Sequence, residues 1–127
     1  MAGKPAPSTL GTTSAIEDYL ERIMELMDEK GYARVVDIAA RLNISQASVT
    51  NMLQKLAAEG LIKYEKYRGL VLTPSGLSVA QTIARRHELL EEFLTLLGVT
   101  PSVIAHDVEG MEHHISPETL EAIQRLT

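Results

Sequence analysis

The sequence predicts a mainly α-helical fold with one small β-hairpin, in the order of a winged helix-turn-helix followed by a helical segment. Three observations support this fold class. Apolar residues recur at helical spacing through 14–30, 36–42 and 45–60. Residues 61–72 are then rich in aromatic and β-branched residues, with a polar centre, which is typical of a two-stranded hairpin. After the hairpin, three Thr-Pro or Ser-Pro pairs mark the starts of three further helices.

The first helix is predicted to begin at Ser14 and to end at Lys30-Gly31. Ser14 and Glu17 have the spacing of a capping box, and glycine is favoured just after a helix C-terminus. Between these ends, apolar residues at i, i+4, i+7 and i+11 share one face, namely Ile16, Leu20, Ile23 and Met27. We expect this face to pack into the core.

The next two helices have the pattern of a helix-turn-helix. A short helix over 36–42 carries Ala39, whose small side chain lets the second helix approach. Asn43 tolerates the positive φ of a tight turn. Ser45 caps the second helix, which ends at Gly60. The inner side of that helix is predicted to hold the apolar residues Ile44, Val49 and Met52.

The helical segment begins after the hairpin. Its helix starts are Thr73-Pro74, Thr100-Pro101 and Ser116-Pro117, each an N-cap residue followed by proline at the first helical position. They predict a long helix to about Gly98, a helix to about His114 and a last helix to the chain end. The predicted organisation is a flexible N-terminal tail at 1–13, a winged helix-turn-helix domain at 14–73 and a helical domain at 74–127.

Composition excludes several classes of protein. The chain has 127 residues and 45% hydrophobic residues, which is enough for a globular core and argues against disorder. No apolar run approaches the roughly 18–20 residues of a membrane span, and residues 1–13 lack the apolar region of a signal peptide. The absence of cysteine excludes disulfides and thiolate metal sites. We therefore expect a cytoplasmic location.

Charge is unevenly distributed along the chain. Residues 32–72 hold six basic and three acidic residues, a net charge of +3, whereas the remaining residues carry a net charge of −8. Local charge decides whether a surface attracts phosphate, so the overall charge of −5 does not exclude nucleic acid as a partner.

The second helix of the helix-turn-helix carries short hydrogen-bonding side chains and a cation on its outward face. Such side chains can contact base edges or phosphates. They are Ser45, Gln46, Ala47, Ser48, Thr50, Asn51, Gln54 and Lys55. Arg34 and the hairpin tip, which contains Lys66, Tyr67 and Arg68, add groups suited to phosphate or minor-groove contact. The alternative interpretation is a solvated polar face on an ordinary three-helix domain.

Carboxylates and imidazoles at helical spacing predict a metal site. Asp18 and Glu21 are i, i+3 on the first helix and border its apolar stripe. Glu109, Glu112 and His113 are i, i+3, i+4 on the helix after Pro101, and His87 lies in the long helix. Inward-facing carboxylates repel one another and lose hydration, and both effects cost free energy. Bound divalent cations remove that cost. The alternatives are a solvated acidic pair at Asp18 and Glu21 and an ordinary surface histidine at His87.

Five stretches of this chain resemble the diphtheria-toxin-repressor family of metal-dependent repressors, in its short manganese-responsive (MntR-like) branch. They are EDYLE at 17–21, EKGYARV at 29–35, YEKYRGLVLT at 64–73, RHELLE at 86–91 and DVEGMEHH at 107–114. The last two are specific to the family. The matching region covers about 100 residues of the chain.

The resemblance implies a homodimer in which metal increases affinity for a palindromic DNA operator upstream of metal-uptake genes. It makes 74–127 a helical metal-binding and dimerisation domain. It also implies a binuclear Mn2+ site, with two ions per subunit, whose ligands are Asp18, Glu21, His87, Glu109, Glu112 and His113. The iron-responsive branch has sulfur-containing residues at the positions of Asp18 and Glu109, and hard oxygen ligands favour Mn2+. The chain ends at Thr127, earlier than expected for the branch, which bears on the dimer interface.

These ligands come from both predicted domains, so metal is expected to fasten the DNA-reading half to the dimer half. In a two-fold dimer this sets the spacing of the two recognition helices near one DNA turn, about 34 Å. One rival is a di-metal hydrolase, but the sequence has no His-Glu-x-x-His, nucleophile elbow or phosphate loop. The other is a winged-helix regulator that senses Fe2+, Zn2+ or a small organic molecule.

Overall fold

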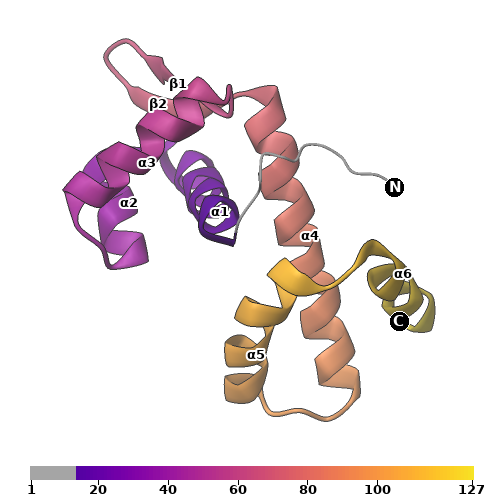
Figure 1. Cartoon of the computed structure of the whole chain (residues 1–127). Helices are drawn as coiled ribbons and strands as arrows, with labels where there is room; N and C mark the ends of the chain where they lie inside the picture. The colour runs from indigo at the N-terminus through magenta and orange to yellow at the C-terminus, as the bar shows by residue number, and fades with distance from the viewer. Residues whose placement is uncertain (1–13) are drawn as a thin grey trace. The chain divides into compact units, whose positions relative to one another are not determined.

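The computed structural model describes residues 14–127, and its elements follow the predicted order (Figure 1). They are α1 (Ser14–Lys30), α2 (Val35–Leu42), α3 (Gln46–Ala58), β1 (Ile62–Glu65), β2 (Gly69–Leu72), α4 (Pro74–Leu96), α5 (Pro101–His114) and α6 (Pro117–Leu126). The chain divides into two compact units, the first ending at Ala80 and the second spanning residues 81–127. The predicted tail at 1–13 lies outside the described residues.

The first unit contains the winged helix-turn-helix. Strands β1 and β2 are antiparallel, with Ile62 opposite Leu72 and Glu65 opposite Gly69. An isolated bridge pairs Ala33 with Leu70, so the segment between α1 and α2 runs beside the hairpin. The core lies where the inner faces of α1, α2 and α3 meet the hairpin, and its fully buried side chains include Leu20, Ile23, Ile38, Val49, Leu53, Leu56 and Leu70. The predicted fold class is confirmed.

Local chemistry explains most of the helix ends. Asn43 has φ 58° at the end of α2, as the turn requires. Ser45 accepts a hydrogen bond from the backbone N–H of Ser48 at 3.1 Å, and Thr73 accepts one from Gly76 at 3.1 Å. Thr100 differs, since its side chain makes no capping hydrogen bond although Pro101 still begins α5.

The prediction that Ile44 lies on the inner side of α3 is wrong, because its side chain is 40% exposed. Ile44 falls in the turn, between the left-handed Asn43 and the cap Ser45, and so precedes the first turn of α3. The inner side is filled instead by Leu53 and Leu56, which are fully buried, together with the predicted Val49 and the partly buried Met52.

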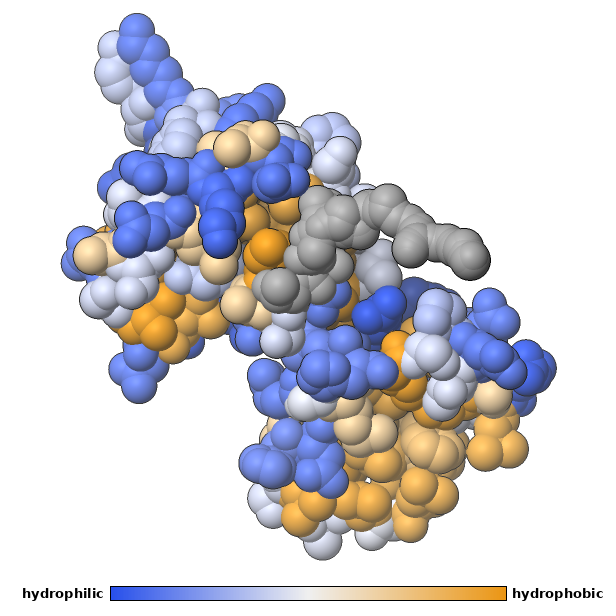
Figure 2. Space-filling model, viewed as in Figure 1, coloured by the Kyte–Doolittle hydropathy of each residue, from blue (hydrophilic) through white to orange (hydrophobic). Residues whose placement is uncertain are grey.

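The second unit is built from the rest of α4 together with α5 and α6. Its small core contains Leu90, Leu94, Ile104, Val108 and Ile123. Large apolar side chains remain exposed on this unit at Leu96, Leu97, Val103 and Leu126. Figure 2 shows hydrophobic surface over the region where α4 passes into α5. None of the helices in residues 14–127 has the length and apolar character that a membrane span requires.

Candidate nucleic-acid interface and metal centre

Helix α3 presents its polar face to solvent. The inner positions Val49, Leu53 and Leu56 are buried, and this orientation directs the intervening residues outward. Every α3 residue predicted to contact DNA is exposed, namely Gln46, Ala47, Ser48, Thr50, Asn51, Gln54 and Lys55, as is the cap residue Ser45. The face contains no acidic residue, so it can hydrogen-bond to base edges without repelling phosphate.

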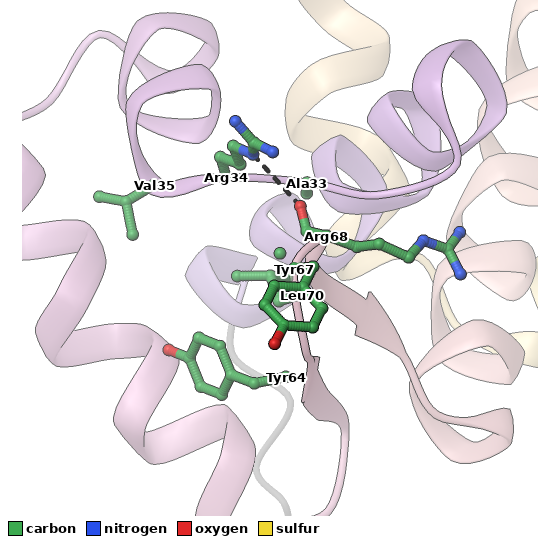
Figure 3. A pocket seen from close by; sticks show the side chains of 8 residues that line it. Ala33, Arg34, Val35, Tyr64, Tyr67, Arg68 and Leu70 are labelled. Carbon is green, nitrogen blue, oxygen red and sulfur yellow. Dashed lines mark hydrogen bonds between the residues drawn. The ribbon is translucent and has the colours of Figure 1, made fainter.

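The predicted arginines beside the hairpin are exposed but already have directed partners within the protein. Arg34 donates from Nε to the carbonyl of Arg68 at 3.2 Å, as Figure 3 shows. Arg68 donates to the Glu65 carboxylate at 2.9 Å and to the carbonyl of Gly31 at 3.0 Å. An open pocket of about 440 Å³ lies here, and Tyr64 and Tyr67 contribute to its lining. Lys66 at the hairpin tip is exposed.

The second unit brings three of the predicted metal ligands together. Nδ1 of His87 on α4 lies 2.7 Å from Oε1 of Glu112 on α5. His113 Nε2 lies 3.5 Å from the other oxygen, Oε2 of Glu112. Glu112 is fully buried, and its Oε2 has no hydrogen-bond partner among the described residues. A buried carboxylate oxygen in this position is suited to a cation.

The electrostatics of Glu112 fit the same interpretation. Burial raises the pKa of its carboxyl, and the nearby carboxylate of Glu109 adds to the rise. The hydrogen bond and charge of His87, with the charge of His113, act in the opposite direction. The ionised carboxylate is therefore incompletely compensated by the protein, and a divalent cation beside it would supply the missing positive charge.

Glu91 is an acid near the site that the sequence analysis missed. Its Oε2 lies 3.2 Å from Nε2 of His87. The i, i+4 spacing of the two residues on α4 was the available signal. The two ring nitrogens of His87 thus lie against two different carboxylates, Glu91 and Glu112.

The other predicted ligands have different surroundings. Glu109 lies on α5 one turn before Glu112, and its side chain is exposed. Asp18 and Glu21 lie on α1 in the first unit, where Asp18 is half-buried and Glu21 is buried. Glu21 Oε1 is 3.1 Å from a guanidinium nitrogen of Arg22. Glu17 is also buried on α1, although the sequence predicted for it only a capping role.

Comparison with known proteins covers nearly the whole chain. Residues 11–70 match the family described as "Iron dependent repressor, N-terminal DNA binding domain". Residues 73–127 match "Iron dependent repressor, metal binding and dimerisation domain". These matches divide the chain between a DNA-binding part and a metal-binding part.

Individual relatives agree with the family matches. The HTH-type transcriptional regulator MntR of Geobacillus thermodenitrificans is 54% identical over 111 residues, which are 87% of this chain and 79% of the relative. MntR of Listeria monocytogenes is 51% identical over 87% of this chain and 78% of its own length.

The solved structure of the manganese-activated repressor ScaR, in its apo form, is 34% identical with a TM-score of 0.77. That match covers 86% of this chain and 52% of the other, so the chain spans about half the length of the ScaR chain.

Proposed function

The chain belongs to the iron-dependent repressor family, and from this premise we propose that it is a Mn2+-activated transcriptional repressor that binds DNA as a homodimer. The resemblance to the MntR-like branch is confirmed by relatives named MntR that are 51% and 54% identical. These names describe transcriptional regulators and not enzymes. The observation that carries the proposal is the buried Glu112 between His87 and His113, in the part of the chain that matches a metal-binding domain.

We propose that six residues hold the metal: Asp18, Glu21, His87, Glu109, Glu112 and His113. All of them offer oxygen or nitrogen, which suits Mn2+, and none offers sulfur. The four carboxylates carry a charge that two divalent ions balance, so the proposed stoichiometry is two ions per subunit. Loading requires the ionised form of Glu112, whose hydrogen bond to His87 must then be exchanged for metal ligation.

The proposed ligands are contributed by α1 and by α4 and α5. Bound metal would be ligated by carboxylates of the DNA-reading part and by imidazoles of the dimerisation part, and so would link the two parts. Loading would therefore shift the protein towards the forms in which both α3 helices of a dimer match successive turns of the operator. The gain in DNA affinity is limited by the fraction of dimers that already have an operator-matching conformation without metal.

We further propose that the operators belong to metal-uptake genes and that the protein acts in the cytoplasm, where it meets the DNA. Repression of uptake at high metal would close a feedback loop. The operator is expected to be palindromic, because a two-fold dimer presents two identical α3 faces.

The test is the affinity of the purified protein for such an operator, titrated with Mn2+ at fixed salt, since the phosphate contribution varies steeply with salt. We expect a rise of about tenfold or more, which Glu109→Ala abolishes; Glu109 is exposed, so the variant should fold. Glu92→Ala removes another exposed acid from the same unit and is the matched control. Equal stimulation of the Glu109 variant would refute the ligand set, and a stronger response to Fe2+ or Zn2+ would refute manganese selectivity.

A further inference from the structure

The hairpin, or wing, is tied to the segment between α1 and α2 by directed hydrogen bonds. Arg68 Nη2 donates to the carbonyl of Gly31 at 3.0 Å, and its Nη1 donates to Glu65 at 2.9 Å. The backbone N–H groups of Ala33 and Leu70 each donate to the other's carbonyl at 2.9 Å. We call the side-chain contacts of Arg68 the wing latch. They connect the turn of the wing to the end of α1.

Two glycines with positive φ lie beside the wing latch. Gly69 has φ 138°, and a Cβ at this position would lie 2.5 Å from the carbonyl oxygen of Ala33. Gly31 has φ 87° and carries the carbonyl that accepts from Arg68. The close approach of the backbone at Gly69 to Ala33 depends on the absence of a Cβ, and both glycines adopt positive φ values that L side chains rarely take.

The two arginines of this region therefore have internal roles. Besides its bond to the carbonyl of Arg68, the guanidinium of Arg34 lies over the Tyr32 ring, 4.8 Å from its centroid. Figure 3 shows the Arg68 side chain extending away from the Tyr67 ring. Arg34 uses one of its five guanidinium donors in these bonds and Arg68 uses two, so the bonds fix where each side chain lies and restrict the directions from which it could bind a phosphate.

The side chains of the wing tip extend into solvent, whereas those of the two arginines hydrogen-bond within the protein. Tyr67 is 90% exposed and has φ 68°, an uncommon conformation for a residue other than glycine. Lys66 Nζ lies 5.2 Å from the centroid of the Tyr67 ring. The tip thus holds a large aromatic ring and a cation together in solvent, on a turn whose backbone is strained. Strained residues of this kind recur at ligand-contacting sites, where the surrounding structure holds them in place.

We propose that Lys66 and Tyr67 are the wing's contacts with the DNA sugar–phosphate backbone, and that Arg68 is a positioning residue that holds them in place through the wing latch. Lys66 would bind a phosphate, and the Tyr67 ring would pack against the adjacent sugar. This inference rests on DNA binding as part of the proposed function. It differs from the sequence-based prediction that Arg68 itself contacts DNA, which is the alternative that the test below decides.

Salt dependence distinguishes a phosphate contact from a positioning role. Each phosphate contact contributes about 0.9 to the slope of log affinity against log salt. Lys66→Ala should lower that slope by about 0.9 and Tyr67→Ala should leave it unchanged, while each weakens binding by roughly fivefold. Arg125→Ala removes an exposed charge from α6, outside the winged helix-turn-helix, and is the control, with affinity and slope unchanged.

Arg68 is tested in two backgrounds. In the otherwise native protein, Arg68→Ala and the charge-conserving Arg68→Lys should weaken binding by a similar factor, because lysine cannot reproduce the two divergent hydrogen bonds. In the Lys66→Ala, Tyr67→Ala double variant, Arg68→Ala should have no further effect. A further loss of affinity in that background, with a slope lower by about 0.9 again, would show that Arg68 binds phosphate directly and would overturn the proposal. Rescue by Arg68→Lys would do the same.

The measurements are made on an operator with Mn2+ and on a duplex without an operator at low salt. Backbone contacts do not depend on sequence, so the pattern among the wing variants should appear on both. If the native protein ignores Mn2+ but the variants behave as expected on both duplexes, the metal-gated function fails and the wing assignment stands. If Lys66→Ala and Tyr67→Ala bind both duplexes like the native protein, the wing assignment fails independently of metal.

Discussion

The two units differ in how far their own residues bury their apolar surface. Among residues 14–127, the core cluster of the first unit contains sixteen buried residues, whereas that of the second contains five. Each unit leaves four large apolar side chains exposed, but in the second unit they accompany a much smaller buried cluster, and its α5 buries the carboxylate of Glu112. The first unit thus has what a stable DNA-reading domain needs. The second has surface and charge that a second copy and a cation would compensate.

The charges of the first unit are largely arranged as ion pairs. Arg41 on α2 donates to both carboxylate oxygens of Glu29 on α1, at 2.6 and 2.7 Å, and also contacts Glu25. Lys30 lies 3.4 Å from Asp37. These pairs connect α1 to the helix-turn-helix at its surface. The contrast teaches that the part of the chain matching a metal-binding and dimerisation domain is the part whose own packing is less complete.

The largest expected effect compares the two cores. Leu53→Ala, in the fully buried core beneath α3, should lower the free energy of unfolding by about 2–5 kcal/mol, because the cavity is enclosed. Leu94→Ala in the second unit should cost less, because Leu94 is 8% exposed at the edge of a small cluster and its site can relax. Urea unfolding followed by circular dichroism measures both. Equal losses would remove the contrast between the units.

The next effect concerns the exposed apolar side chains. Leu97 is 61% exposed in the turn that follows α4, and Leu97→Asp should weaken dimerisation at least tenfold, about 1.4 kcal/mol. Sedimentation equilibrium measures the dissociation constant. Gln81→Asp places the same charge at an exposed polar position on α4 and should leave it unchanged. An unchanged dimer in the Leu97 variant would mean that another surface pairs the subunits.

A smaller effect, and one of opposite sign, is expected at Glu112. Burial raises the pKa of Glu112, so keeping its carboxylate ionised lowers the free energy of unfolding at pH values above the ordinary carboxyl pKa. This loss of stability disappears when the pH falls below the ordinary carboxyl pKa, because the group is then protonated in both the folded and the unfolded state. Glu112→Gln should therefore stabilise the metal-free protein at pH 7 by about 1 kcal/mol while abolishing the response to Mn2+. Thermal unfolding with and without Mn2+ checks both parts. A destabilised metal-free variant would show that the protein itself already compensates the carboxylate.

The sequence predicted the features that depend on local chemistry. Ser45, Thr73 and Ser116 begin helices because their hydroxyls accept from backbone N–H groups three residues later. The metal-ligand prediction remains a proposal for all six residues. The grouping of Glu109, Glu112 and His113 on α5 could be predicted because i, i+3 and i+4 positions share a helix face.

The features that escaped prediction depend on tertiary packing. The carbonyl partner of Arg68 is Gly31, which lies 37 residues earlier in the chain. Ile44 is apolar, yet the turn directs it to solvent. Neither result follows from residue spacing, because helical periodicity does not determine which loops approach each other or where a turn directs one side chain.

The smallest effect tests the ion pairs of the first unit by their pH dependence. The hydrogen bonds from Arg41 lower the pKa of Glu29 below its ordinary value. The pair therefore contributes stability above the ordinary carboxyl pKa of about 4.3, and this contribution is lost as pH falls through the lowered pKa of the folded state. The difference in unfolding free energy between the native protein and Glu29→Gln should be constant at neutral pH and vanish in acid. Because both side chains are solvent-exposed, it should be smaller than the effects above. A difference that grows as pH falls would have the wrong sign for this pair and would place the link between α1 and α2 in the apolar core alone.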